Sequence, residues 1–307
     1  MIVLRRLDRL LFGSGTSRRL VVAHVGLALV IGLRIALGPY PRLAGQPAAL
    51  FRPLSFVRVL DQMPPLAVIV GLQVAGTIAA ALAVIGWRRR ATFAAAWVSL
   101  LVLAGLRSSL GKILHNDVLL LLAAVPFLLA PVVRWPGRDE PSPRFGWPVN
   151  AALATVAGAY FFSGLAKLTT SGLNWVTGDN LRYVMYDAAR AGRVMFPDVP
   201  LLIADHAWLA HLTAAGALAF ELTFPIVLIV KRLRPIYAAW AVTLHIGTWL
   251  ALGLDYWLWI AVVLLIVVDP SYAMYSTKRS SWRRLRHSKT PSQWVPYSDT
   301  IESPVSQ

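Results

Sequence analysis

Long apolar stretches follow one another along most of this sequence, and they constrain the fold more than any other feature. Each runs for about 18 to 22 residues, the length of a helix that crosses a bilayer, without the alternation typical of strands. Lipid accepts only helices or closed barrels, because every backbone polar group must be hydrogen-bonded internally. We therefore predict an all-α fold, a polytopic membrane helical bundle of about eight transmembrane helices.

The limits of the predicted spans follow from the ends of the apolar stretches. They cover residues 20–37, 66–86, 91–106, 114–133, 149–168, 212–230, 236–252 and 256–268. Residues 201–210 are also apolar but include Asp205 and His206, and we interpret them as a helix in the membrane interface.

Composition supports a membrane protein and excludes several other classes. Charged residues make up only 14% of the chain, whereas soluble domains have about 25%. The net charge of +16 would suggest nucleic acid in a soluble protein, but here the basic residues lie in short clusters between apolar stretches. We therefore expect the lipid bilayer as the partner and no nucleic acid. Cysteine is absent, which excludes disulfides and thiol nucleophiles.

The distribution of lysine and arginine predicts the orientation. Two thirds of the 30 basic residues lie in alternate loops and in the two terminal segments, as in the cytoplasmic segments of membrane proteins. We expect both termini to be cytoplasmic in a bacterial inner membrane, with an even number of spans. Three parts follow: a basic N-terminus over residues 1–19, a transmembrane domain over 20–269, and a basic, Ser/Pro-rich, disordered tail over 270–307.

Ionisable and polar residues inside the predicted spans are few and costly in lipid, so they are candidates for function. They are His24, Arg34, His115, Asn116, Asp117, Lys167, Glu221 and His245. The predicted topology places most of them near the outer face, where one outward-facing polar pocket would collect them. Asn116 or Asp117 has the alternative role of capping the start of a helix. No metal is predicted, since no spacing typical of a metal site is present.

Lys167 is the sharpest candidate because Tyr160, Ser163, Gly164 and Lys167 share one helical face. An amine held in an apolar wall loses hydration, which lowers its pKa and allows it to act as a base. The alternative is a lysine whose amine reaches the headgroups. Glu221 is placed in the middle of a span and needs a polar partner, such as His245 or a residue of the fifth span.

The sequence around Lys167 resembles a known family. Residues 159–168 read AYFFSGLAKL, Trp175, Gly178 and the run LRY at 181–183 follow them, and residues 115–120 read HNDVLL. These segments resemble the horizontally transferred transmembrane (HTTM) family, which includes the membrane domain of vitamin K-dependent gamma-glutamyl carboxylase and the sporulation-delaying protein B-like proteins. The resemblance covers roughly residues 10–270.

In the carboxylase, the lysine at the position of Lys167 is regarded as the base that deprotonates a reduced quinone, which oxygen then converts to an epoxide. The resemblance therefore implies Lys167 as catalytic base and a reduced quinone as cofactor. The large luminal domain of the carboxylase has no counterpart in this sequence, so we do not expect carboxylation of glutamate. We place around Lys167 the supporting residues His115, Asn116, Asp117, Tyr160, Ser163, Gly164, Trp175, Glu221 and His245.

Three functions remain open at this point. The first is a carboxylase/epoxidase-like membrane oxidoreductase, whose outward-facing apolar pocket binds or oxidises a quinone-like or lipid ligand. The second is a non-enzymatic accessory protein for the export or maturation of a peptide. The third, a small-solute transporter, ranks last because the sequence shows no inverted repeats and no broken helices.

The predicted orientation can be tested with reporter fusions. Fusions after Arg89, Gly137 and Arg232 and in the C-terminal tail should report the cytoplasm, and fusions after Gln46 and Gly178 should report the outside. A tail that reports the periplasm would contradict an even number of spans.

Overall fold

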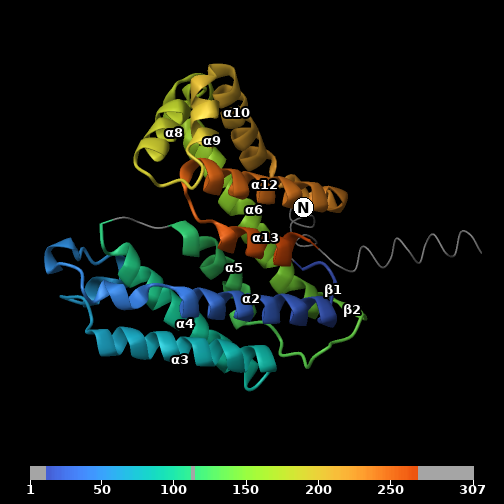
Figure 1. The fold of residues 1–307 in the computed structure, drawn as a ribbon. Helices are drawn as coiled ribbons and strands as arrows, with labels where there is room; N and C mark the ends of the chain where they lie inside the picture. Colours follow the sequence, from blue (N-terminus) through green and yellow to red (C-terminus); the bar gives the residue numbers. More distant parts are fainter. Residues whose placement is uncertain (1–11, 112–114, 269–307) are drawn as a thin grey trace, which may run out of the picture. The chain divides into compact units, whose positions relative to one another are not determined.

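The computed structural model describes residues 12–111 and 115–268, which are helical apart from turns, loops and one short strand pair (Figure 1). Strand β1 (Gly15–Thr16) pairs antiparallel with β2 (Pro141–Ser142), so the starts of two long helices lie together. The all-α prediction is confirmed. The predicted tail over 270–307 lies outside the described residues, as do residues 1–11 of the predicted N-terminal segment.

Five helices are long and apolar enough to cross a membrane, which suits an integral membrane protein. They are α2 (Ser17–Leu37), α3 (Leu66–Ile85), α4 (Arg89–Ser108), α6 (Pro143–Ser171) and α12 (Arg234–Leu252). Two apolar helices are shorter, α5 (Val118–Leu128) and α13 (Trp257–Val267), and α9 (Asp198–Asp205) forms a bent pair with α10 (Ala207–Thr223). The number of eight spans therefore remains a prediction.

Short helices and turns connect these elements. They are η1 (Tyr40–Leu43), η2 (Ala48–Leu50), η3 (Ser55–Val59), η4 (His115–Asp117), α7 (Asn174–Thr177), α8 (Asn180–Arg190), α11 (Ile226–Ile229) and η5 (Lys231–Leu233). Helices α8 and α9 pack against α10 and α12.

The prediction of one interfacial helix over residues 201–210 was wrong. The chain bends by 102° between α9 and α10. His206 stands at the bend with an extended backbone, and its Nδ1 donates a hydrogen bond to the Leu202 carbonyl oxygen at 2.9 Å. The imidazole ring thus donates to a carbonyl oxygen near the end of α9, where the carbonyl groups no longer have backbone N–H donors within the helix. The predicted span over 212–230 is also divided, because Pro225 has no backbone N–H and separates α10 from α11.

Helix α2 is closed at both ends by side chains. Thr16 accepts a hydrogen bond from the Arg19 backbone N–H at 3.1 Å and caps the start. At the other end, Gln73 of α3 donates to the carbonyl oxygens of Ile35, Ala36 and Gly38 at 2.8, 3.3 and 3.0 Å. The last carbonyls of a helix have no partner within it, and in lipid they must find one elsewhere in the protein.

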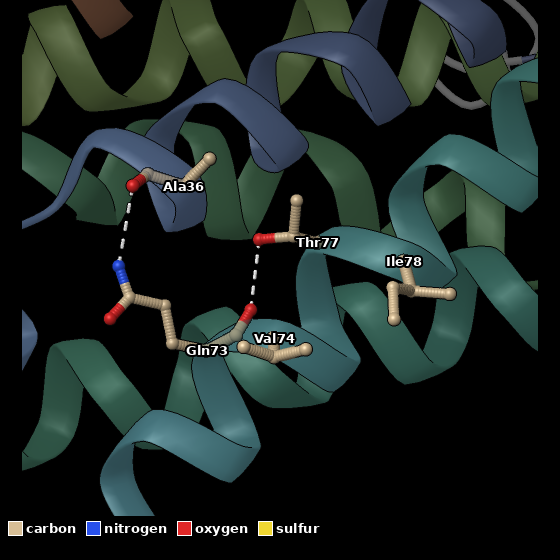
Figure 2. A pocket seen from close by; sticks show the side chains of 5 residues that line it. All are labelled: Ala36, Gln73, Val74, Thr77 and Ile78. Atoms are coloured by element: carbon tan, nitrogen blue, oxygen red, sulfur yellow. Dashed lines mark hydrogen bonds between the residues drawn. The ribbon is translucent and has the colours of Figure 1, made fainter.

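A shallow pocket lies beside this contact, on the surface formed by α2 and α3. It is lined by Ala36, Gln73, Val74, Thr77 and Ile78, and Figure 2 shows Gln73 reaching across to Ala36. The Thr77 hydroxyl donates to the Gln73 carbonyl oxygen at 2.8 Å, so its proton is not free to bind a ligand in the pocket. The pocket is apolar and contains none of the candidate residues predicted from the sequence.

Helices α2, α3 and α4 lie side by side and approach closely through small residues (Figure 1). A Cβ atom on Gly76 would lie 2.6 Å from the Cβ atom of Ser99, and one on Gly32 would lie 2.9 Å from that of Ala80. The atoms that an added methyl group would meet are Cβ atoms, which are fixed to the backbone of the neighbouring helix. The helices would therefore have to separate to admit a methyl group.

We expect Gly76→Ala to lower the stability of the purified protein in detergent. The clash with Ser99 should cost about 1–3 kcal/mol, more than the gain in helix propensity of about 1 kcal/mol. Gly71→Ala is the matched control in the same helix, because nothing lies within 4 Å of an added Cβ atom there. Thermal unfolding should show a lower midpoint for Gly76→Ala alone. Equal midpoints for both variants would contradict the close approach of α3 and α4.

Candidate functional site

Four of the predicted residues form two ion pairs, and the predicted residues do not all meet in the single pocket that we expected. Lys167 pairs with Glu221, and Asp117 pairs with Arg34. The reason is that a carboxylate was available to each cation on a neighbouring helix, and in a low-dielectric interior each charge is held by its nearest opposite charge.

The first cluster joins α6 to α10, and we call it the Lys167–Glu221 site. Lys167 Nζ donates to both carboxylate oxygens of Glu221, at 2.6 and 2.7 Å, and to Ser163 Oγ at 2.9 Å. Ser163 Oγ donates in turn to Glu221 Oε1 at 3.3 Å. The Lys167 side chain is 22% exposed and that of Glu221 11%, so the pair is largely enclosed but open on one side.

The helical face predicted from the sequence is the face that meets α10. Gly164 makes this possible, since a Cβ atom there would lie 2.9 Å from the Cβ atom of Glu221. The expectation that Glu221 has a polar partner in the fifth predicted span is confirmed, and the partner is Lys167. The Lys167 amine thus contacts a carboxylate of the next helix, which differs both from an amine in an apolar wall and from one directed to headgroups.

Trp175 covers the amine. The Nζ atom of Lys167 lies 5.4 Å from the centre of the indole ring, a cation–π geometry. Gly172, at φ 57°, turns the chain after α6 so that α7 returns to this position. Trp175 Nε1 is buried and has no hydrogen-bond partner within residues 12–111 and 115–268. A buried donor without an acceptor is uncommon in proteins and marks this position as one that needs an explanation.

Tyr160 and His245 form a second polar contact further along the same face of α6. The Tyr160 hydroxyl and His245 Nε2 are 2.7 Å apart. Their rings lie in an aromatic group that includes Phe220, Phe224 and Trp259. His245 Nδ1 is buried without a partner in the part of the chain described, so this histidine is only half satisfied.

The second cluster lies between the ends of α2 and α4 and the start of α5. Arg34 Nε and Nη2 donate to the two carboxylate oxygens of Asp117, at 2.5 and 3.1 Å. Arg107 Nη1 lies 3.9 Å from Asp117 Oδ2, which is an ion pair without a hydrogen bond. Arg107 was missed by the sequence prediction, because it follows the predicted third span and resembles an ordinary loop arginine.

The alternative role left open for Asn116 or Asp117, capping a helix with the side chain, is not observed in the described residues. Asp117 immediately precedes α5, but its side chain makes no capping hydrogen bond. A two-pronged bond to a guanidinium is stronger than a bond to a neutral N–H and takes both carboxylate oxygens. The Asn116 side chain donates to the Asp255 carbonyl oxygen, and His115 is exposed, with its carbonyl oxygen accepting from Trp259 Nε1 at 3.3 Å.

His24 lies away from both clusters. It is 2% exposed and its ring makes edge contacts with Phe93 and Phe127. Its environment is that of a core residue.

Comparisons with models of protein families, with curated proteins and with solved structures find no match for this chain. The resemblance to the HTTM family therefore remains a prediction, and the site is interpreted from its own geometry.

The Lys167–Glu221 contact predicts strongly coupled effects of mutation on stability. Lys167→Met leaves a carboxylate without its cation, and Glu221→Gln leaves an ammonium without its anion, so each single variant should unfold at a lower temperature. The double variant should be more stable than the sum of the two losses predicts, by about 0.5–3 kcal/mol. Thermal unfolding of the four proteins in one detergent measures this coupling. Additive losses would show that the pair contributes no direct interaction.

Proposed function

We propose that this protein is an integral membrane protein that binds a quinone-like or lipid ligand at the Lys167–Glu221 site, with Lys167 as the base for a ligand hydroxyl. The observation that supports this is the ion pair itself, on facing positions of two apolar helices. Desolvation offsets much of the attraction in a buried ion pair, so such a pair is a poor means of stabilising a bundle. Ionisable groups in membrane spans are usually there for function.

The contacts of Lys167 suggest how it would become a base. Its ammonium must first release a proton, and the nearest acceptor is the Glu221 carboxylate at 2.6 Å. Transfer leaves a neutral amine and a protonated glutamate. The amine then takes the proton of the ligand hydroxyl, which gives a ligand oxyanion beside the restored ammonium. Over both steps one proton moves from the ligand to Glu221, while Ser163 keeps the amine in position.

The surroundings suit a planar ligand with a polar edge. Trp175 presents an indole face and an Nε1 atom without a partner in the described residues, and the Tyr160 ring lies one turn before Ser163 in α6. Aromatic rings stack on planar ligands, and a free N–H binds a carbonyl oxygen such as that of a quinone. The resemblance to the HTTM family also implies a reduced quinone as cofactor. The same resemblance implies the enzyme class, a carboxylase/epoxidase-like oxidoreductase.

The proposal predicts that an isoprenoid quinone co-purifies with the protein. Mass spectrometry of lipids extracted from the purified protein should detect it with the wild type and at least tenfold less of it with Lys167→Met. Lys231→Met is the control, because Lys231 is exposed and lies in η5. Equal quinone content in all three proteins would refute binding at this site and favour the accessory-protein alternative.

The role of Lys167 as a base has its own test. Lys167→Arg keeps the positive charge, but guanidinium does not release its proton at ordinary pH. We expect this variant to retain some quinone and to lose at least 100-fold in the rate at which dissolved oxygen oxidises the quinol in proteoliposomes. An arginine variant that oxidises quinol at the wild-type rate would rule out the base and leave Lys167 as a binding residue.

A further inference from the structure

The cluster around Arg107 contains buried hydrogen-bond donors that have no acceptor among the residues that the structure describes. It consists of Arg34, Tyr40, Arg107 and Asp117, and we call it the Arg107 cluster. Arg34 and Arg107 stand near the carboxyl ends of α2 and α4, Tyr40 begins η1 directly after α2, and Asp117 precedes α5. All four therefore lie at the same end of this group of helices, where a bundle in a membrane meets the headgroups.

The described residues of this cluster include more buried hydrogen-bond donors than acceptors that bond them. Each oxygen of Asp117 accepts one hydrogen bond from Arg34, and Arg107 Nη1, at 3.9 Å from Oδ2, is too far from Asp117 to form a hydrogen bond. Arg107 Nη1 and the Tyr40 hydroxyl are buried and make no hydrogen bond within the described residues. A buried donor without an acceptor is costly, and two in one place need an explanation.

The two orphan groups belong to one network of contacts around the Arg34–Asp117 pair. Tyr40 is 1% exposed, and its hydroxyl lies within electrostatic range of Arg34, Arg107 and Asp117. Arg34 Cζ is 6.0 Å from the centre of the Tyr40 ring. Burial raises the pKa of Tyr40 to about 12, so its hydroxyl is neutral and keeps its proton for donation.

The nearby acidic residue does not complete the cluster. Asp255 lies within electrostatic range of Arg34, but it is exposed, and its Oδ1 accepts from the Trp257 backbone N–H at 3.2 Å. The Arg107 side chain is 27% exposed, so part of it faces the exterior, while its Nη1 atom is buried. No residue in the ranges 12–111 and 115–268 supplies this acceptor, and one from outside the chain would complete the cluster.

We propose that Arg107 and Tyr40 form a binding site for a phosphate group, with Arg34 and Asp117 holding the site in shape. Phosphate offers several acceptor oxygens and a negative charge, which match a guanidinium and a neutral hydroxyl. At the end of membrane helices the most abundant source is the headgroup of a phospholipid, and basic pockets between such helices bind headgroups. This site is distinct from the Lys167–Glu221 site and does not rest on the proposed function.

Native mass spectrometry of the protein in detergent tests the proposal with two variants. Arg107→Gln removes the charge, and Tyr40→Phe removes only the hydroxyl and keeps the buried ring. With added phosphatidylglycerol, the wild type should bind one lipid molecule, and each variant should bind it about tenfold more weakly, as expected for a lost bond to a charged group. Arg58→Gln is the control, because it removes the same charge from an exposed position in η3.

A second set of measurements distinguishes a phospholipid headgroup from soluble phosphate. It also detects a variant that fails to fold. Inorganic phosphate that displaces the lipid, or that raises the unfolding temperature of the wild type but not of Tyr40→Phe, would identify a site for soluble phosphate. Tyr40→Phe should unfold at the wild-type temperature without ligand, because its hydroxyl has no partner to lose. Binding of lipid and phosphate that is unchanged in both variants, or a wild type that binds neither, would overturn the proposal.

Discussion

Lipid offers no hydrogen bonds, and the need to pair buried polar groups inside the protein is the constraint on which this structure depends. The contact between Gln73 and the end of α2 answers this constraint for backbone carbonyls. Arg89 does the same at the start of α4, where it donates to the carbonyl oxygens of Ala83 and Val133 at 3.2 and 2.5 Å. These side chains fix how neighbouring helices are placed along one another, because a shift by one turn would leave the carbonyls unpaired.

The two ion pairs answer the same constraint in different ways. The Arg34–Asp117 pair is nearly closed, with side chains 9% and 2% exposed, and its two parallel bonds use the full geometry of the guanidinium. The Lys167–Glu221 pair is more open, and a compact ammonium leaves room for a further partner. The closed pair suits a structural role and the open pair suits a site where a ligand meets an ionisable group. The orphan donors at Arg107 and Tyr40 lie beside this closed pair and make no hydrogen bond within the described residues.

Local patterns in the sequence predicted the parts of the site that lie on one helix. Tyr160, Ser163, Gly164 and Lys167 share a face because their spacing matches the helical turn, and that face is the one that meets α10. The bend at His206 was missed, because Leu201–Ala210 has no glycine or proline at the break to indicate it. Arg107 was missed because its importance comes from Asp117 and Tyr40, which belong to other segments.

The sequence by itself determined that the chain is helical and apolar enough for a membrane, because the length and hydropathy of each stretch are local properties. It also determined which ionisable residues need partners, since any charge in an apolar helix does. Only the tertiary structure decided the partners. Lys167 and Glu221 are 54 residues apart and Arg34 and Asp117 are 83 apart, so their meeting depends on which helices pack together and in what register. Helix packing selects among several possible pairs of charges, and no local pattern records that choice.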